Sequence, residues 1–178
     1  MHLPDVSAAE GERAAVRRRT LSALYEEHVG RATALARLLT GDDAAAEDLA
    51  HEAFIRTAGR FAHLRQPDAF GAYLRTTVVN LSRARFRRQR LERQWLRRQD
   101  PAEPVAQSPF DPDDRATVWA AIQGLPWRQR AAVVLRYYED VSHPEIARLL
   151  RCSVGAVESL QSRAMTTLRS TITREDVR

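Results

Sequence analysis

Cysteine and catalytic motifs are scarce in this sequence, and their scarcity limits the functions open to the protein. Cys152 is the single cysteine, so the chain forms no internal disulfide and offers no second thiolate for a zinc site. The five histidines are scattered without metal-ligand spacing, and neither a glycine-rich phosphate loop nor a nucleophile motif is present. We therefore expect no catalytic residue, no metal and no cofactor.

Glycine and long apolar runs are also few. Only 7 residues are glycine, β-branched residues rarely follow one another, and no alternating strand pattern occurs, which predicts an all-α fold. No segment approaches the length of a membrane span. The first residues carry acidic and basic side chains without an apolar run, unlike a signal peptide. We expect a cytoplasmic protein that does not contact a membrane.

Lysine is absent, so all 28 basic residues are arginine. Codon bias in a GC-rich genome would explain this by itself. It still has a physical consequence, because a guanidinium contacts phosphates and guanine edges with paired hydrogen bonds, whereas lysine offers a point charge. The net charge of +5 suits a polyanionic partner such as nucleic acid. A merely solvated basic surface would have the same net charge.

The charges form blocks that divide the chain. Residues 83–98 hold eight arginines and one glutamate, whereas residues 100–114 hold five acids, four prolines and no basic residue. The second stretch cannot continue a helix and buries little, so we interpret it as part of a flexible linker. The sequence predicts two small helical domains at 20–92 and 113–172, a linker at 93–112, and tails at 1–19 and 173–178.

The C-terminal domain contains a helix-turn-helix pattern. A short helix, opened by a capping box at Ser142 and Glu145, ends near Leu150, and Ser153 caps a longer helix after a tight turn. One side of the longer helix is apolar, and the other is polar with small side chains, as insertion into a major groove requires. An ordinary helix pair with a solvated face would look the same. The candidate residues for duplex DNA are Arg151, Ser153, Gly155, Glu158, Ser159, Ser162 and Arg163.

A helix expected over residues 70–90 carries a continuous polar stripe beside its core side. The predicted core residues are Phe70, Tyr73, Leu74, Thr77, Leu81 and Ala84. The arginines of the stripe can contact phosphates, and its amide and hydroxyl groups can form hydrogen bonds with base edges. This combination indicates a face that binds nucleic acid. Its candidate residues are Tyr73, Thr76, Asn80, Arg83 and Arg87. Tyr73 borders the stripe, and both core packing and stacking on an unpaired base remain open for it.

A further helix, over about residues 44–57, has two faces of different chemistry. Small and apolar residues from Ala46 to Thr57 form its buried face, whereas the opposite face is acidic and would repel DNA. An apolar residue among these carboxylates indicates a protein partner of complementary charge, or else packing under another segment of the same domain. The candidate residues for a partner are Glu47, Asp48, His51, Glu52 and Ile55.

Sequence motifs occur in three stretches: Asp-Leu-Ala-His-Glu-Ala-Phe at 48–54, Phe-Gly-Ala-Tyr-Leu-Arg at 70–75, and Leu-Pro-Trp-Arg-Gln-Arg at 125–130. Asn80-Leu81 and Arg-Phe-Arg-Arg at 85–88 follow the second, and Val-Leu-Arg-Tyr-Tyr-Glu at 134–139 follows the third. In this order the motifs resemble those of bacterial sigma factors of the extracytoplasmic-function (ECF) family. The resemblance covers roughly residues 20–170.

The resemblance implies a sigma factor, which makes or breaks no covalent bond and lends promoter recognition and strand opening to the polymerase. The first domain would bind core RNA polymerase and the −10 element, and the second would bind the −35 element as duplex. The implied partners are core RNA polymerase and promoter DNA, with an anti-sigma protein common in the family. Outside the holoenzyme the protein would be a monomer. The acidic linker would run toward the RNA exit path, or serve only as a tether.

Four positions depart from the family pattern. Tyr73 stands where tryptophan is usual, and Ala84 where an aspartate often follows the asparagine. Glu158 and Leu160 occupy recognition-helix positions that are often basic. Glu158 repels phosphate but can accept a hydrogen bond from cytosine, and Leu160 points to the core side. Phosphate contacts would then fall to Arg148, Arg151, Arg163 and Arg169.

A stand-alone helix-turn-helix regulator is the main alternative. Such a protein binds duplex DNA without polymerase, usually as a dimer on a palindrome. The sequence has no heptad repeat and no long apolar stripe for dimerisation, which argues against it. An RNA-binding protein is a weaker alternative, indicated only by the arginine run.

Overall fold

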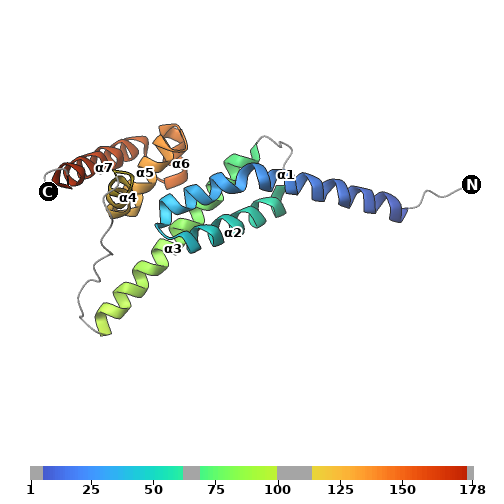
Figure 1. The fold of residues 1–178 in the computed structure, drawn as a ribbon, viewed down its shortest axis with the longest axis horizontal. Helices are drawn as coiled ribbons and strands as arrows, with labels where there is room; N and C mark the ends of the chain where they lie inside the picture. The colour runs from blue at the N-terminus through green and yellow to red at the C-terminus, as the bar shows by residue number, and fades with distance from the viewer. Residues whose placement is uncertain (1–5, 62–68, 100–113, 176–178) are drawn as a thin grey trace, which may run out of the picture.

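The computed structural model describes residues 6–61, 69–99 and 114–175, and these residues form helices and no strand (Figure 1). In chain order the helices are α1 Val6–Thr40, α2 Asp43–Phe61, α3 Phe70–Gln99, α4 Asp114–Gly124, α5 Trp127–Tyr137, α6 His143–Leu150 and α7 Val154–Glu175. The all-α class is confirmed. None of the described helices has both the length and the hydropathy needed to cross a membrane.

Two helices are longer than the sequence predicts. α1 begins at Val6, inside the expected tail at 1–19, because residues 6–19 are rich in alanine, arginine and glutamate and contain no proline. α3 runs to Gln99, inside the expected linker, because residues that favour helix continue almost to Pro101. The helix ends there because the residue before a proline, Asp100, disfavours the helical conformation. Residues 1–5, 62–68, 100–113 and 176–178, with the parts of the predicted tails and linker that they contain, lie outside the described residues.

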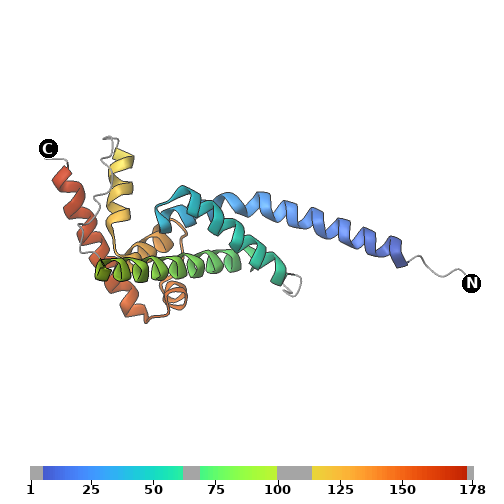
Figure 2. The same cartoon turned by 90° about the horizontal axis from the view of Figure 1, so that it is seen from below.

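Helices α1, α2 and α3 form the first bundle, and the N-terminal part of α1 extends beyond it (Figures 1 and 2). The predicted buried face of α2, from Ala46 to Thr57, is confirmed. Gly41 separates α1 from α2 with a φ of +73°, and its N–H donates to the Arg37 carbonyl at 2.8 Å. Asp42 then caps α2 by accepting a hydrogen bond from the Ala45 N–H at 3.0 Å.

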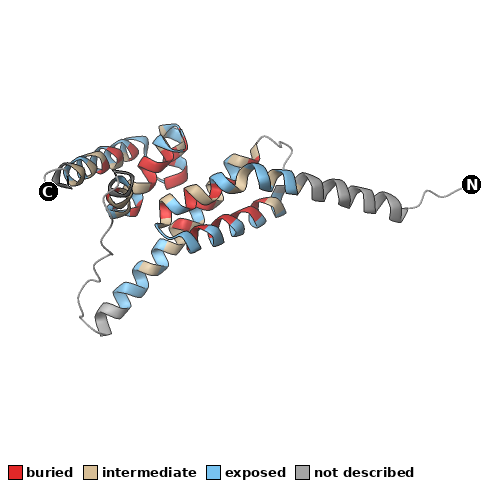
Figure 3. Cartoon of the chain, in the orientation of Figure 1, coloured by how far each residue is buried: buried red, intermediate tan, exposed pale blue. Residues whose placement is uncertain are grey.

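The predicted core side of α3 is partly wrong. Phe70 and Leu74 are buried as expected, but Val78 and Val79 are fully buried, and Tyr73 is 48% exposed. A single helical wheel assumes one buried side. α3 has two, because it packs against the first bundle on one side and against helices of the C-terminal half on the other. Beyond the bundle, the far part of α3 is largely exposed (Figure 3).

Helices α4 to α7 form the second bundle and include the predicted helix-turn-helix, α6–turn–α7. Arg151 closes α6 in the left-handed region with a φ of 52°. The Ser153 hydroxyl accepts a hydrogen bond from the Ala156 N–H at 3.2 Å, so the predicted cap of α7 is confirmed. The predicted capping box on α6 is wrong. Ser142 makes no side-chain cap, and Glu145 instead binds Arg75 of the first bundle at 3.1 Å.

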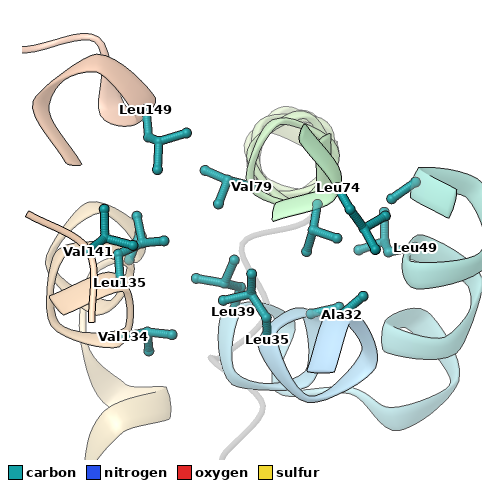
Figure 4. Close-up of a cluster of buried hydrophobic side chains, with 14 of the residues drawn as sticks. Ala32, Leu35, Leu39, Leu49, Leu74, Val79, Val134, Leu135, Val141 and Leu149 are labelled. Atoms are coloured by element: carbon teal, nitrogen blue, oxygen red, sulfur yellow. The ribbon is translucent and has the colours of Figure 1, made fainter. Parts of the chain in front are cut away.

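The two bundles share one apolar core, which the sequence does not predict. Figure 4 shows Val79 of α3 directed toward Leu149 of α6, and Leu39 and Leu35 of α1 belong to the same cluster. Leu135 of α5 and Val141 complete the apolar contact from the second bundle. The two helical bodies are therefore packed together here, in addition to being joined by the chain.

The turn at Gly41 supplies a test of the fold. Gly41→Ala should lower the free energy of unfolding by about 1–2 kcal/mol, because an L residue is strained at positive φ. The new Cβ would also lie 2.5 Å from Oε1 of Gln123. Gly59→Ala is the matched control. Gly59 lies inside α2 with open space around its Cβ position, so this change should raise stability by about 0.5–1 kcal/mol. Urea denaturation measures the free energy of unfolding of both variants. Equal midpoints for the two variants would contradict the strained, positive-φ turn assigned to Gly41.

Candidate nucleic-acid and partner interfaces

The outer face of α7 is open and polar. The candidate residues Ser153, Gly155, Glu158, Ser159, Ser162 and Arg163 are all exposed, as is Arg151 in the turn. Val157 and Ala164 are fully buried on the opposite side, and Leu160 is half-buried, as the helical wheel predicts. The helix-turn-helix thus presents small side chains and arginines to solvent, which suits a helix that enters a major groove.

Polar side-chain contacts hold α7 and α6 in this geometry. Gln161 is buried, and its side-chain amide donates to the Ala132 carbonyl at 3.2 Å, which fixes α7 against α5. The guanidinium of Arg128 donates to the Leu150 carbonyl at 3.2 Å, at the end of α6 where carbonyls lack helical partners. Sequence analysis missed both contacts, because a helical wheel says nothing of partners on other helices.

Glu158 has a neighbour on α6. Its Oε1 lies 3.9 Å from Nδ1 of His143, so a protonated imidazole would form an ion pair with it. The glutamate itself is exposed on the outer face of α7. It therefore lies where it would face either a base edge or a phosphate.

Four of the five candidates on α3 lie on its solvent side. Asn80 and Arg87 are exposed, Tyr73 is about half exposed, and Thr76 is half-buried with its hydroxyl donating to the Ala72 carbonyl at 2.8 Å. Core packing of Tyr73 is thus excluded as its main role, and its ring is accessible for stacking. These residues form an accessible polar surface on the described part of α3.

Arg83 is the exception, because it is turned toward the second bundle. Its guanidinium lies 5.6 Å from the centre of the Trp127 ring and donates to the Leu149 carbonyl. Burial lowers the pKa of Arg83, and the positive charges of Arg151, Arg128 and Arg87 lower it further. In this arrangement Arg83 does not share the open surface with Asn80.

Arginines of the motif at residues 125–130 also have structural roles. Arg130 donates to the carbonyls of Leu39 and Leu125 at 3.1 and 3.2 Å and to Oε1 of Gln123 at 2.5 Å. Burial lowers its pKa to about 10, so it keeps its charge at neutral pH. Both terminal nitrogens of Arg130 and one of Arg128 thus donate to oxygens of the protein itself. A high arginine content does not by itself measure the DNA-binding surface.

The acidic face of α2 borders a groove against α1. All five candidates line it: Glu47, Asp48, His51, Glu52 and Ile55. Ile55 is 58% exposed, so the alternative in which another segment covers it does not hold among the described residues. The opposite wall contains Tyr25, Val29 and Thr33 of α1. Sequence analysis missed this wall, because nothing in the α1 sequence points to a partner.

Aromatic contacts set the shape of this groove. The ring of Tyr25 meets the Phe54 ring edge-on, with centroids 5.0 Å apart, and it lies 6.4 Å from the imidazole of His51. Phe54 in turn contacts Phe70 at 5.5 Å, which ties the groove to the core of the first bundle. The groove therefore rests on the aromatic core of the first bundle, and Ile55 and the carboxylates are among its lining residues. Among the described residues, no three histidine, cysteine, aspartate or glutamate side chains gather as a metal site.

The chain thus combines an all-helical first bundle that has a polar α3 surface with a second bundle that has an open helix-turn-helix. Residues 24–92 match the family Sigma-70 region 2, and residues 115–168 match Sigma-70, region 4. The stand-alone regulator is thereby excluded, since such a protein would have no region 2.

Similar proteins are sigma factors. The chain is 34% identical over 147 residues to RNA polymerase sigma-E factor of Streptomyces coelicolor, covering 80% of each chain. It is 35% identical over 154 residues to ECF RNA polymerase sigma factor SigE of Mycolicibacterium smegmatis, covering 82% of this chain and 59% of that one. The sigma factor RpoE of Bartonella quintana, solved in complex with the anti-sigma factor NepR, has a similar fold, with a TM-score of 0.64 and 22% identity over 85% of this chain and 96% of that one. The chain belongs to the ECF family of RNA polymerase sigma factors.

The position of Glu158 predicts a change in duplex binding. Glu158→Lys should raise non-specific affinity for duplex DNA and steepen its salt dependence by about one unit, because one repulsive carboxylate is replaced by a phosphate contact. Titration of a fluorescent duplex at several salt concentrations measures the slope. Glu26→Lys, which makes the same charge change at an exposed position of α1, is the control for net charge. Equal slopes for the two variants would place Glu158 away from DNA.

Proposed function

We propose that this sigma factor binds core RNA polymerase through the groove between α1 and α2. The observation that carries the proposal is the exposed Ile55, which lines the groove together with four acidic or imidazole side chains. An apolar centre with a charged surround is the usual composition of a protein interface, where burial of the apolar group supplies affinity and the charges select the partner. The resemblance of residues 48–54 to the family's polymerase-docking motif supports this choice of partner.

The α3 surface would hold the opened −10 strand. Tyr73 offers an accessible ring, and Asn80 offers an amide at the distance of two helical turns. Stacking on an aromatic side chain stabilises a base by about 1–3 kcal/mol, which is comparable with the few kcal/mol needed to unstack it. Binding of single-stranded bases would therefore favour an open duplex without any covalent chemistry. We expect the protein to catalyse no reaction of its own.

The outer face of α7 would read the −35 element as duplex. Its small side chains allow close approach, and Arg163 and Arg151 lie where they can reach phosphates. Glu158 gives this surface an acceptor that would favour cytosine at one position. We also propose that the protein acts in the cytoplasm, where polymerase and chromosome are found, and that an anti-sigma protein binds it, as NepR binds RpoE.

Ile55→Glu tests the polymerase interface. We expect polymerase binding to fall more than tenfold, because a new carboxylate would lose its water in an apolar contact among existing acids. Helical content should stay unchanged, since Ile55 is largely exposed. Ala44→Glu adds the same charge to α2 at an exposed position that does not line the groove, and it should bind normally. Pull-down with core polymerase measures the binding of both variants. Binding of Ile55→Glu at the wild-type level would show that this groove is not the polymerase interface.

Asn80→Ala tests the −10 surface. We expect this variant to reduce promoter opening and transcript yield about tenfold. A loss of this size corresponds to the roughly 1–3 kcal/mol expected for one lost base contact. Polymerase binding should be unchanged. Permanganate footprinting and transcript sequencing with reconstituted holoenzyme give the two readouts. Ser22→Ala, at an exposed site on α1, is the control. Equal transcription from Asn80→Ala and wild type would show that the stripe does not contact the promoter.

A further inference from the structure

An open cavity lies apart from the three candidate surfaces. It is lined by the C-terminal end of α1, by residues within 82–93 of α3, and by parts of α4 and α5. None of the candidate residues for polymerase, for the −10 strand or for the −35 duplex lines it. Its volume of about 740 Å³ falls within the range of small-molecule sites, about 300–1,000 Å³. The cavity is thus large enough for a small ligand, and the proposed function assigns it no role.

The lining of this cavity is basic. Arg85, Arg93 and Arg130 line it, whereas no aspartate or glutamate of the described residues does. Asp42 partly neutralises one of these arginines, because its Oδ2 accepts from Arg85 at 3.3 Å. Arg93 is exposed, and neither it nor Arg130 forms an ion pair with another described residue. Two positive charges therefore stay without a carboxylate, and an anion is the ligand that they attract.

Two buried polar groups that belong to lining residues have no partner. Ser82 is 2% exposed, and its Oγ makes no hydrogen bond. Nε of Arg130 is also buried without an acceptor, although the other two nitrogens of this guanidinium donate to protein oxygens. A buried polar group without a partner lowers stability, so its presence in a folded protein requires an explanation. Both groups can donate a hydrogen bond, which suits the oxygens of a phosphate.

Aromatic and amide side chains complete the lining. The rings of Trp119 and Phe86 both line the cavity. Each ring also has one neighbour in the protein, since the guanidinium of Arg37 lies 5.3 Å from the centre of the Trp119 ring and Phe86 stacks on Trp127. Gln89 is half-buried in the same lining, and its amide makes no hydrogen bond with another described residue. Aromatic rings stack on bases, and amides can bond base edges, so the cavity offers contacts for a base as well as for phosphates.

We propose that this cavity binds a free nucleoside di- or triphosphate, with the phosphates at the arginines and Ser82 and the base at the aromatic rings. Three arginines suit a ligand with more than one phosphate, because each guanidinium can bond phosphate oxygens with paired donors. A free nucleotide is favoured over a DNA strand, since neither candidate DNA surface lines the cavity and its volume is that of a small-molecule site. The inference does not depend on the proposed function.

Calorimetric titration of the full chain with ATP and with GTP tests the site. At least one of them should bind saturably, with one molecule per chain, and should raise the melting temperature, because a ligand of the folded state stabilises that state. Pyrophosphate and the matching nucleoside each keep only half of the contacts, so each should bind about tenfold more weakly or less. Absence of saturable binding by both nucleotides would overturn the proposal, as would pyrophosphate that binds as tightly as the nucleotide.

Arg93→Gln tests the phosphate contact. Its affinity for the nucleotide should fall about tenfold, the change expected for one lost hydrogen bond between charged groups. The fold should be unaffected, since Arg93 is exposed. Arg88→Gln is the matched control, because it makes the same charge change at an exposed position of α3 that does not line the cavity. It should bind as the wild type does. Equal losses in the two variants would show attraction by net charge alone and would overturn the site.

Ser82→Ala separates binding from folding. The variant removes a buried hydroxyl that has no partner, so the melting temperature of the nucleotide-free protein should stay the same or rise. Its affinity for the nucleotide should nevertheless fall about threefold, as expected for the loss of one neutral hydrogen bond. A hydroxyl with only a structural role would change the melting temperature and leave the affinity as it is. Nucleotide binding by Ser82→Ala at the wild-type level would overturn the contact assigned to Ser82.

Discussion

The contact between the two bundles is the constraint on which the rest of this structure depends. Leu39 and Val79 pack against Leu135 and Leu149 from the other half, and a buried carboxylate binds arginines on both α1 and α3. The apolar contact brings the halves together without direction, whereas ion pairs with fixed geometry set their relative orientation. The placement of the α7 face relative to the α3 surface follows from this contact.

Arginine performs two kinds of work in this chain. Some guanidinium groups point to solvent, such as Arg87 and Arg163, and are available to phosphates. Others are half-buried and donate to carbonyls at helix ends, such as Arg83 and Arg130. The planar guanidinium suits both uses, because it stays charged when partly buried and carries five donors. A protein without lysine can therefore build both its interior contacts and its exposed basic surface from the same side chain.

The ECF resemblance and the geometry complement each other. The motif at residues 48–54, which resembles the family's polymerase-docking pattern, lies on a helix whose exposed face combines Ile55 with carboxylates, and this composition suits a protein partner better than DNA. The motif at residues 125–130 has a different meaning, because Arg128 and Arg130 cap carbonyls and hold the second bundle. Matching motifs can thus reflect binding in one case and folding in another.

Local patterns in the sequence determined the helices, the buried face of α2, the cap at Ser153 and the solvent exposure of most candidate residues, because period, capping and charge act within a few residues of one another. Only the tertiary structure decided which contacts Val79, Arg83 and Glu145 make. Each of them finds a partner on the other bundle, and the hydrogen-bond partners of Arg83 and Glu145 lie 66 and 70 residues away in the sequence. A helical wheel assigns one buried side to a helix, and the second buried side of α3 exists only because another bundle covers it.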